Sequence, residues 1–477
     1  MGTSIRQRER SERAAGPPAR VRLPAEGVSP LDFLAAGGEM RPRGYWRRGG
    51  EWSAWWGSAW RIEVARGSGE ERFAAVREAA ARLGGTAEEP REAHAPRAEP
   101  VPAAEGAAPA PRLLGGFAFH PGHRPQAEWA GFPSARFDLP AFELRGGAEG
   151  EPVLLAAAAA GDGGRDRAER EGRRLLERLR RGGGARPGAA ADRNGRLPTV
   201  LGVGHPVSRE DWCRGVEAAL RAIRAGTLRK VVLARPADVR LAAAPDPLLV
   251  LARLAERDEG GFPFLFEPGP GAVFLGISPE LVAVREGGRF HASAVAGTAP
   301  RSDDPSEDER LGRELLESAK DRTEHAIGVQ DMRERLAALG EDPDVDESPH
   351  LLRLRGIQHL RTDFSVRVGG DRHVLELLAG MHPTAAVSGY PRGPAAAFLA
   401  ETESFERGWY AGPVGWFDPS GDGTFAPALR CAVLRGDRAR LFAGAGIVEG
   451  SDPGREWDET AMKLRPVLEA LGGAPEA

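Results

Sequence analysis

Lysine is scarce in this chain, and its three copies are the first residues that could do chemistry. The sequence has 65 Lys plus Arg residues, and all except Lys230, Lys320 and Lys463 are arginine. Arginine keeps its proton in proteins, whereas lysine can lose it where burial or a nearby cation lowers its pKa. The surroundings of Lys230 and Lys463 favour a chemical role. Taken alone, Lys320 is better explained as a surface lysine kept by chance.

Two pairs of carboxylates are spaced so that each pair lies on one face of a predicted helix. The pairs are Asp321 with Glu324 and Glu456 with Glu459, and Lys463 continues the face of the second pair. Two helices that each offer a pair could hold Mg²⁺, which binds few carboxylates and keeps several waters. Taken separately, each pair is more often a solvated acidic face with salt bridges.

Other segments add groups that suit a small polar pocket. The stretch FLGISPELVAV places Glu280 just beyond a predicted strand, where it could be a general acid or a carboxylate that stabilises a turn. The stretch RLFAGAGIVEG predicts a glycine-rich turn whose N–H groups could bind a carboxylate, since its spacing does not fit a dinucleotide fingerprint. The stretches GIQHLRTDF and WYAGPVGWFD contribute His359 and Tyr410.

The elements around Lys230 place it in the interior. Ser208 can cap a helix, and Gly226 can end it. One face of this helix carries Trp212, Val216, Leu220 and Ile223. Lys230 then begins the run KVVLA, which predicts a buried strand. A cation at that position is costly without a purpose. The carboxylate pairs belong to predicted helices over residues 311–339 and 451–471.

The chain divides into regions of different composition. We expect a disordered tail over residues 1–30, an N-terminal part of the fold over 31–200, and a catalytic region over 205–472. The N-terminal part contains two low-complexity loops, 85–112 and 161–196, the second with a short basic helix; neither has enough periodic apolar residues to build core. The segment GYWRRGGEWSAWWGSAWRIEV predicts two paired strands with a Gly-Gly turn, rather than a single-stranded nucleic-acid surface.

The overall composition excludes several classes of protein. The 477 residues carry a formal net charge of -4, which gives no reason to expect a nucleic acid or an anionic membrane as partner. The longest apolar run, near residues 153–160, is too short to span a bilayer, and the first residues lack the apolar core of a signal peptide. Cys213 and Cys431 have neither metal nor redox spacing. We expect a cytoplasmic protein.

Ten motifs, in order, resemble those of chorismate-utilising enzymes, and they are most similar to those of isochorismate synthases. They cover roughly residues 205–472 and read RKVVLAR, FLGISPEL, AVAGTAPR, SAKDRTEH, GIQHL, HPTAAVSG, WYAGPVGW, ALRCAVL, FAGAGIV and EWDETAMKL. The resemblance implies an α/β (α+β) fold with two large antiparallel sheets in a sandwich flanked by helices. The N-terminal part resembles the family more loosely, through LLGGFAF.

The resemblance also implies roles for individual residues. Lys230 would be the base that activates water, and Glu280 the acid that protonates the departing hydroxyl. Glu324 and Glu459 would bind Mg²⁺ directly, with Asp321 and Glu456 in the water-mediated shell. The substrate-binding residues would be Gly297, Thr298, His359, Ala386, Tyr410, Arg430, Gly444 and Lys463. Among these, Arg430 and Tyr410 would hold the enolpyruvyl carboxylate, and Lys463 and Gly444 the ring carboxylate.

Single positions favour one subfamily. Anthranilate synthases, which use ammonia, lack the lysine found here as Lys230. Aminodeoxychorismate synthases carry a lysine where this chain has Ala296, and salicylate synthases have a polar Thr-Ala pair in place of Ala386 and Val387. The resemblance therefore predicts a monomeric isomerase that converts chorismate to isochorismate, for menaquinone rather than siderophore synthesis. The alternatives are a salicylate synthase, an anthranilate synthase component I, and a catalytically silent chorismate-binding subunit.

Overall fold

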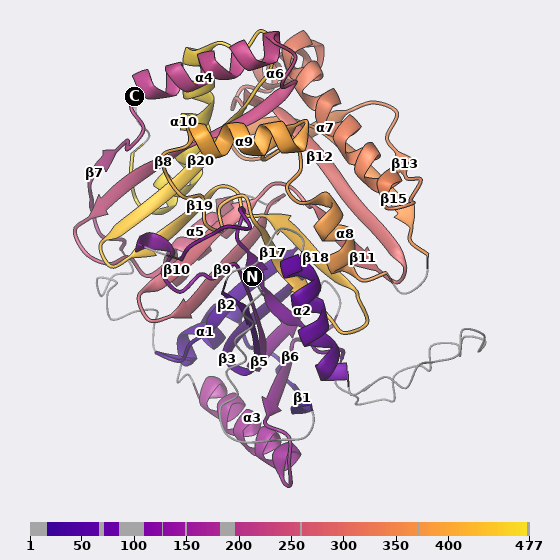
Figure 1. The fold of residues 1–477 in the computed structure, drawn as a ribbon. Coiled ribbons are helices and arrows are strands. Elements are labelled where there is room, and N and C mark those ends of the chain that lie inside the picture. Colours follow the sequence, from indigo (N-terminus) through magenta and orange to yellow (C-terminus); the bar gives the residue numbers. More distant parts are fainter. Residues whose placement is uncertain are drawn as a thin grey trace.

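Antiparallel strands make up most of the computed structural model of this chain (Figure 1). The structure describes residues 17–65, 71–84, 109–125, 127–147, 150–181, 196–257, 260–369 and 372–474. The strands of the N-terminal part are β1 (Ala19–Pro24), β2 (Arg43–Arg48), β3 (Glu51–Val64), β4 (Leu113–Phe117), β5 (Ala135–Gly146) and β6 (Val153–Ala158).

The remaining strands and the helices follow in a mixed order. The strands are β7 (Val200–Gly204), β8 (Lys230–Leu241), β9 (Phe262–Gly269), β10 (Ala272–Ser278), β11 (Ala283–Glu286), β12 (Arg289–Pro300), β13 (Asp344–Val345), β14 (His350–Arg353), β15 (Ile357–Arg367), β16 (Gly389–Tyr390), β17 (Pro413–Phe417), β18 (Gly423–Pro427), β19 (Cys431–Arg435) and β20 (Arg438–Ile447). The helices are α1 (Pro30–Ala36), α2 (Glu71–Ala81), α3 (Gly164–Arg180), α4 (Arg209–Arg224), α5 (Pro247–Arg257), α6 (Pro305–Glu317), α7 (Ala319–Ala338), α8 (Val374–Met381), α9 (Arg392–Thr402) and α10 (Pro453–Ala470), with short 3₁₀ turns at Arg82–Gly84 and Ala127–Trp129.

The strands in the described part of the chain form one hydrogen-bonded network of 20, whereas the resemblance implied two large antiparallel sheets in a sandwich. From one edge of β5 an arm runs through β3, β2, β9, β10, β19 and β20 to β8. From its other edge a second arm runs through β4, β17, β18, β11 and β12 to β15. The arms stay connected because β5 pairs along both of its edges. The mixed α/β class is confirmed.

Helices cover the two arms where the predicted site residues lie. Figure 1 shows α10 beside β20 and α7 beside β12, and α10 also packs on α4. The predicted helix and strand around Lys230 are confirmed as α4 and β8. Ser208 caps α4 by accepting a hydrogen bond from the N–H of Asp211 at 3.0 Å, and Gly226 has a φ of +75°. No helix in the described part of the chain combines the length and apolar character needed to cross a bilayer.

The N-terminal predictions are confirmed in one place and corrected in two. Strands β2 and β3 form the expected pair, with Arg48 opposite Glu51 across the turn at Gly49. The tail expected over 1–30 is too long, because β1 lies within it and pairs with β6 along its length. Residues 1–16 and 85–108 lie outside the described part.

The part of the segment 161–196 that begins at residue 161 and ends at residue 181 contributes to the core, contrary to expectation, and residues 182–195 lie outside the described part. Its helix α3 runs for 17 residues and packs on β1 and β6. Leu175 and Leu176 are buried there, together with Ala168 and Gly172. The four residues are spaced so that the small ones allow close approach to the sheet, and a Cβ at position 172 would lie 2.6 Å from a methyl carbon of Leu23. Because glycine and alanine occupy much of the buried face, only Leu175 and Leu176 mark it as apolar in the sequence. The segment therefore resembled a low-complexity loop.

Candidate active site

Lys230 opens β8 with its side chain in the interior, as predicted. It is 1% exposed, and its Nζ lies 3.1 Å from Oε1 of Glu324. On the neighbouring strand β20, a Cβ at Gly446 would lie 2.0 Å from that carboxylate oxygen and 2.9 Å from Cε of Lys230. Glycine at position 446 is therefore required for the lysine and the glutamate to meet. The sequence analysis missed Gly446, although the spacing in AGAGI was visible.

The carboxylates of the first pair are placed by a break between two helices. The helix predicted over 311–339 is instead α6 and α7, which are separated at Ser318. The Ser318 side chain accepts a hydrogen bond from the N–H of Asp321 at 3.3 Å, and its hydroxyl donates to the Asp321 carboxylate. This cap starts α7 at the site, so that Asp321 lies in its first turn and Glu324 follows on the same face. A continuous helical periodicity concealed the break.

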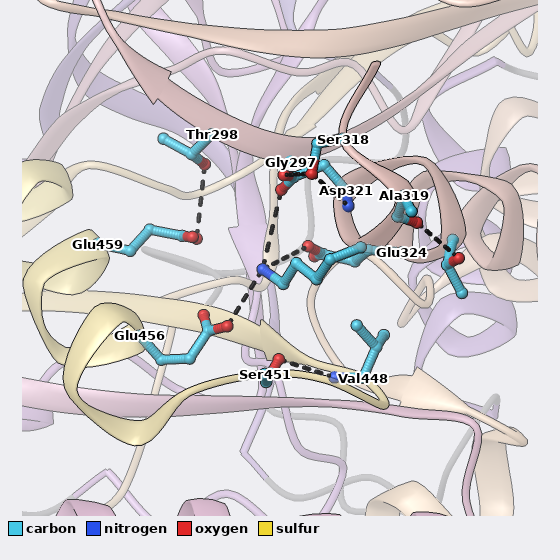
Figure 2. Close-up of polar contacts among 12 residues, drawn as sticks. Gly297, Thr298, Ser318, Ala319, Asp321, Glu324, Val448, Ser451, Glu456 and Glu459 are labelled. Atoms are coloured by element: carbon cyan, nitrogen blue, oxygen red, sulfur yellow. Dashed lines mark hydrogen bonds and ion pairs between the residues drawn. The ribbon is translucent and has the colours of Figure 1, made fainter. Parts of the chain in front are cut away.

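The second pair of carboxylates faces the first across a shared space, and Lys320 occupies that space. Figure 2 shows the side chains of Asp321, Glu324 and Glu456 directed toward one another. The Nζ of Lys320 lies 3.1 Å from Oε1 of Glu456, 3.5 Å from Oε2 of Glu324 and 3.8 Å from Oδ1 of Asp321. The interpretation of Lys320 as a surface lysine is therefore wrong. Its ammonium is held where a cation is attracted by several carboxylates at once.

The charges of this cluster set opposite pKa directions on two glutamates. Burial alone would raise the pKa of Glu324, but the lysine ammonium groups outweigh it and lower that pKa to about 2. Burial, and then the neighbouring carboxylate of Glu459, raise the pKa of Glu456 to about 7. Within the described residues, Oε2 of Glu324 and Oε2 of Glu456 accept no hydrogen bond. These two oxygens therefore have hydrogen-bonding capacity that the described residues do not use, although the Lys320 ammonium lies 3.5 Å from Oε2 of Glu324.

The donor set fits a hard divalent ion. Mg²⁺ binds carboxylate oxygens and retained waters, and the Lys320 ammonium shows that the space accepts a cation. No three of the four predicted ligands Asp321, Glu324, Glu456 and Glu459 present oxygen atoms that all lie within 4.8 Å of one another. A tighter group in the described part of the chain consists of Asp346, His350 and Asp363, which are largely solvent-exposed. That group lies on the surface, and its charges are mostly solvated.

Lys463 and the carboxylate beside it line the far end of the cluster. The Nζ of Lys463 donates to Oε1 of Glu459 at 2.7 Å and to the carbonyl of Gly444 at 2.9 Å. The hydroxyl of Thr298 donates to the same carboxylate oxygen at 3.5 Å (Figure 2). Gly444 and Gly446 lie within strand β20, so the predicted glycine-rich turn is wrong. Their role is to let side chains approach the strand.

His359 holds an arginine in place from the opposite wall. Its Nδ1 lies 2.8 Å from the carbonyl of Gly297, and its Nε2 lies 2.6 Å from Nη2 of Arg430. Burial, and then the charge of Arg430, hold the pKa of His359 well below its ordinary value. The neutral ring therefore carries its proton on Nδ1 and accepts from the guanidinium through Nε2. Arg430 has a φ of +44°, a strained conformation that is typical of functional positions.

Glu280 is a buried carboxyl that keeps its proton at neutral pH. It is 2% exposed, and its Oε1 accepts no hydrogen bond from the described residues. Burial raises its pKa to about 8, even though the positive charge of Lys230 lowers it in part. Tyr410 is buried as well, and its ring stacks on Phe442 with centroids 5.1 Å apart. A protonated carboxyl is thus available to a molecule bound between β8 and β12.

One cavity collects most of the residues predicted from the sequence. The predicted residues that line it are Glu280, Gly297, Thr298, Glu324, His359, Ala386, Tyr410, Arg430, Gly444 and Lys463. Lys230 and Glu459 touch this lining through Glu324 and Lys463, and Asp321 and Glu456 lie behind it in the cluster around Lys320. The lining residues that the sequence analysis missed include Val295, Leu429 and Phe442, which are apolar and have no pattern that separates them from core.

Comparisons with known proteins identify the family of this chain. The chain matches the family described as "Chorismate binding enzyme" over residues 6–472. It is 35% identical over 457 residues to a protein of Pseudomonas aeruginosa named "Salicylate biosynthesis isochorismate synthase", covering 94% of this chain and 90% of that one. It is 32% identical over 363 residues to "Isochorismate synthase MenF" of Bacillus subtilis, covering 76% of this chain and 75% of that one.

A solved structure shares the fold. The menaquinone-specific isochorismate synthase MenF of Escherichia coli superposes with a TM-score of 0.73 at 27% identity, covering 96% of both chains. The family match spans nearly the whole sequence, including the N-terminal part that resembled the family only loosely. By its sequence, its fold and the lining of its cavity, the chain belongs to the family of chorismate-binding enzymes.

Proposed function

We propose that this enzyme is a Mg²⁺-dependent isochorismate synthase, an isomerase that moves the hydroxyl group of chorismate from C4 to C2. The observation that carries the proposal is that Lys230 and Glu280 are both buried beside the same cavity. A buried lysine and a buried carboxyl with a pKa of about 8 offer a base and an acid close to one cavity. Relatives with isochorismate synthase names support the same reaction.

The reaction needs one proton removed and one proton supplied. Lys230 acts as the base and takes a proton from water as the water oxygen bonds to C2 of the ring. The ring double bonds shift, the C4–O bond breaks, and Glu280 gives its proton to the departing hydroxyl, which leaves as water. One water enters and one leaves, so substrate and product are isomers. General acid and base groups of this kind each contribute about 10²–10⁴-fold.

The carboxylate cluster would hold the metal. Glu324 and Glu459 would bind it directly, and Asp321 and Glu456 through water. When bound, Mg²⁺ supplies positive charge that attracts a substrate carboxylate and offsets the charge of the glutamates. Lys320 has to give up its present contacts with the carboxylates in that state.

The two carboxylates of chorismate set its orientation. Lys463 and the backbone at Gly444 would hold the ring carboxylate beside the metal cluster. Arg430, kept in position by His359, would hold the enolpyruvyl carboxylate with Tyr410. Ala386 lines the ring pocket, as do Gly297 and Thr298. This leaves the ring between the base on β8 and the acid that follows β10.

A product assay tests the proposal directly. Chorismate with Mg²⁺ should give isochorismate in a reversible equilibrium, EDTA should abolish turnover, and added Mg²⁺ should restore it. Chromatography of the products separates the alternatives. Stoichiometric salicylate and pyruvate would make the enzyme a salicylate synthase, and anthranilate formed with ammonium would make it an anthranilate synthase component. Full activity in EDTA would remove the metal from the proposal.

We propose isochorismate rather than salicylate as the released product because of the pocket wall. Ala386 and Val387 line the cavity and offer no hydroxyl to the substrate. Loss of pyruvate requires the enolpyruvyl group to fold over the ring, and an apolar wall gives that conformer no polar contact. We further propose menaquinone synthesis as the pathway, on the segment HPTAAVSGYPR. Deletion of the gene should then deplete menaquinone, and retained menaquinone would point to another pathway.

A further inference from the structure

A second cavity formed by the described residues is separate from the catalytic one. It has a volume of about 610 Å³ and lies between α2, α9 and two connecting segments, 119–124 and 403–408. None of the residues assigned above to acid–base chemistry, the metal or the substrate lines it. The proposed reaction therefore gives this cavity no role.

One wall of the cavity carries Arg72, a buried cation that forms no ion pair with a carboxylate of the described residues, although its guanidinium lies 5.1 Å from the centroid of the Phe73 ring. Arg72 is 2% exposed, and its Nη2 donates a long hydrogen bond of 3.4 Å to the carbonyl of Phe119. Its Nε and Nη1 have no hydrogen-bond partner among the described residues. Burial, and then the charge of Arg392, lower the pKa of Arg72 to about 9, so it remains charged at neutral pH. Burying an unpaired charge costs several kcal/mol.

A second polar group in the same lining is also unpartnered. The hydroxyl of Ser388 is buried and forms no hydrogen bond within the described part of the chain. Buried hydroxyl and guanidinium groups are almost always satisfied, so two open ones at one cavity need an explanation. An acceptor that enters the cavity could satisfy both Ser388 and Arg72.

The rest of the lining limits the chemistry of such a ligand. The charge of Arg407 is already paired with Glu403, so it adds no free cation. The rings of Phe73, Phe119 and Phe405 line the wall beside further charged groups, which include Arg124 and Arg392. Inorganic phosphate would offer charge to such groups but no ring to pack on the phenylalanine side chains. A single carboxylate on a ring matches both features.

We propose that this cavity binds a small aromatic monocarboxylate, with its carboxylate on Arg72 and Ser388 and its ring against the phenylalanine side chains. This site is distinct from the catalytic cavity, because the two cavities have no lining residue in common. It would remove the energetic penalty of the unpaired guanidinium, since the ligand supplies the missing charge. The proposed ligand would contact none of the residues assigned to the reaction, because none of them lines this cavity.

The two cavities share a wall, so a ligand in one should affect the other. The guanidinium of Arg407 lines the second cavity and donates to the carbonyl groups of Val387 and Val232, both at 2.7 Å. Val387 and Val232 line the catalytic cavity. The N–H of Val232 also donates to the carbonyl of Ser388 at 2.8 Å. Bound carboxylate should therefore change turnover as well as bind.

Benzoate is the probe, and the catalytic cavity must be filled first because it also binds carboxylates. The full-length Lys230→Gln variant, saturated with chorismate and Mg²⁺, is titrated with benzoate in a calorimeter. We expect saturable binding of one benzoate. Arg72→Met should weaken it by about tenfold or more, because a hydrogen bond to a charged group is lost. Arg77→Met removes an exposed arginine from the same helix and should leave binding unchanged.

Neutral and dianionic probes test the chemical class. Benzamide, which lacks the charge, and inorganic phosphate, which lacks the ring, should each bind much more weakly than benzoate. Equal binding of benzamide would reduce the site to an apolar cavity, and equal binding of phosphate would overturn the choice of a monocarboxylate. Absence of saturable benzoate binding, or binding insensitive to Arg72→Met, would overturn the site itself.

A second variant tests the same site if Arg72→Met fails to fold. Ala396→Trp, on a half-buried position of α9, should fill the cavity and abolish benzoate binding without removing a charge. In the otherwise unmodified enzyme, benzoate should change kcat at saturating chorismate, and Ala396→Trp should remove this effect. An effect of benzoate that survives Ala396→Trp would place it in the catalytic cavity. These titrations do not depend on which product the enzyme releases.

Discussion

Glu324 is the residue on which the lysines of the chain converge. Lys230 contacts one of its oxygens and Lys320 approaches the other, while the charge of Lys463 acts on it from across the cluster. All three lysines of the sequence thus belong to one site. In the proposed mechanism the three lysines serve as a base, a resident cation and a substrate contact, and Arg430 is the arginine that contacts the substrate.

The first residue-scale prediction concerns the base. Lys230→Arg keeps the positive charge but cannot lose its proton, so turnover should fall by at least about 10²–10⁴-fold. Calorimetry should show that chorismate still binds, because the contacts to its carboxylates remain. Turnover within a few-fold of the unmodified enzyme would remove Lys230 from the mechanism.

The second concerns the acid and its pH dependence. The pKa of Glu280 is raised to about 8, so the carboxyl is protonated below that pH and loses its proton above it. The kcat/KM for chorismate should therefore fall as the pH rises through about 8. Glu280→Gln should be nearly inactive, and its residual rate should lack this alkaline decline. A rate that keeps rising to pH 9 would exclude Glu280 as the acid.

The third concerns the resident cation. Lys320 must leave the carboxylates before a metal can take its place, so Lys320→Met should bind Mg²⁺ several-fold more tightly in calorimetry without substrate. Lys320→Arg, which keeps a cation there, is the matched control and should not show the gain. Weaker binding in Lys320→Met would mean that the lysine supports the metal instead of competing with it.

At this scale the sequence predicted the reactive groups better than their neighbours. Lys230 and Glu280 were singled out because the first begins an apolar strand and the second follows one. The roles of base and acid came from the resemblance. Lys320 was not, since its position depends on the helix break beside it. Gly446 was missed because the requirement for glycine arises from Glu324, a residue more than one hundred positions away in the chain.

At the scale of elements, the break between α6 and α7 brings the carboxylates to the site. Ser318 begins α7 and orients Asp321 at the same time. The helix over 208–225 was predicted correctly because its cap and its glycine stop lie at its ends. The break at Ser318 was not, because a serine inside a continuous helical pattern resembles any exposed polar residue.

The prediction at this scale compares two serine N-caps, Ser318 of α7 and Ser208 of α4. Ser318→Ala should lower the free energy of unfolding by about 1 kcal/mol, the usual cost of losing an N-cap, and should raise the Mg²⁺ concentration needed for activity. Ser208→Ala removes the corresponding cap of α4 and should cost similar stability with no change in Mg²⁺ requirement. Equal Mg²⁺ dependence in both variants would separate the helix break from the metal site.

At the scale of the whole molecule, the sheet joins the N-terminal part to the catalytic region. Strand β5 connects both arms, and β2 pairs with β9 across the expected domain boundary. Composition indicated an N-terminal region of different character, and the class of fold followed from the motifs. The connection did not, because strand pairing between distant segments leaves no local signal.

The continuous sheet predicts cooperative unfolding. Leu176→Ala, in α3, should cost about 2–5 kcal/mol, as for other buried leucines, and lower the melting temperature of the whole chain. Calorimetry should give one transition that coincides with loss of activity. The exposed pair Arg173 and Glu169 on the same helix offers a control, since Arg173→Ala should change stability by less than about 1 kcal/mol. Two separate transitions would show that the regions unfold independently.

The placement of all lysines in one site also makes the residue type a natural spectroscopic label. Protein grown on ¹⁵N-lysine would carry isotope at positions 230, 320 and 463 alone. Every Nζ resonance in its NMR spectrum would therefore come from the active site, without engineered tags and without assignment of the other side chains. Each stage of metal and substrate addition could then be followed as a change in three signals.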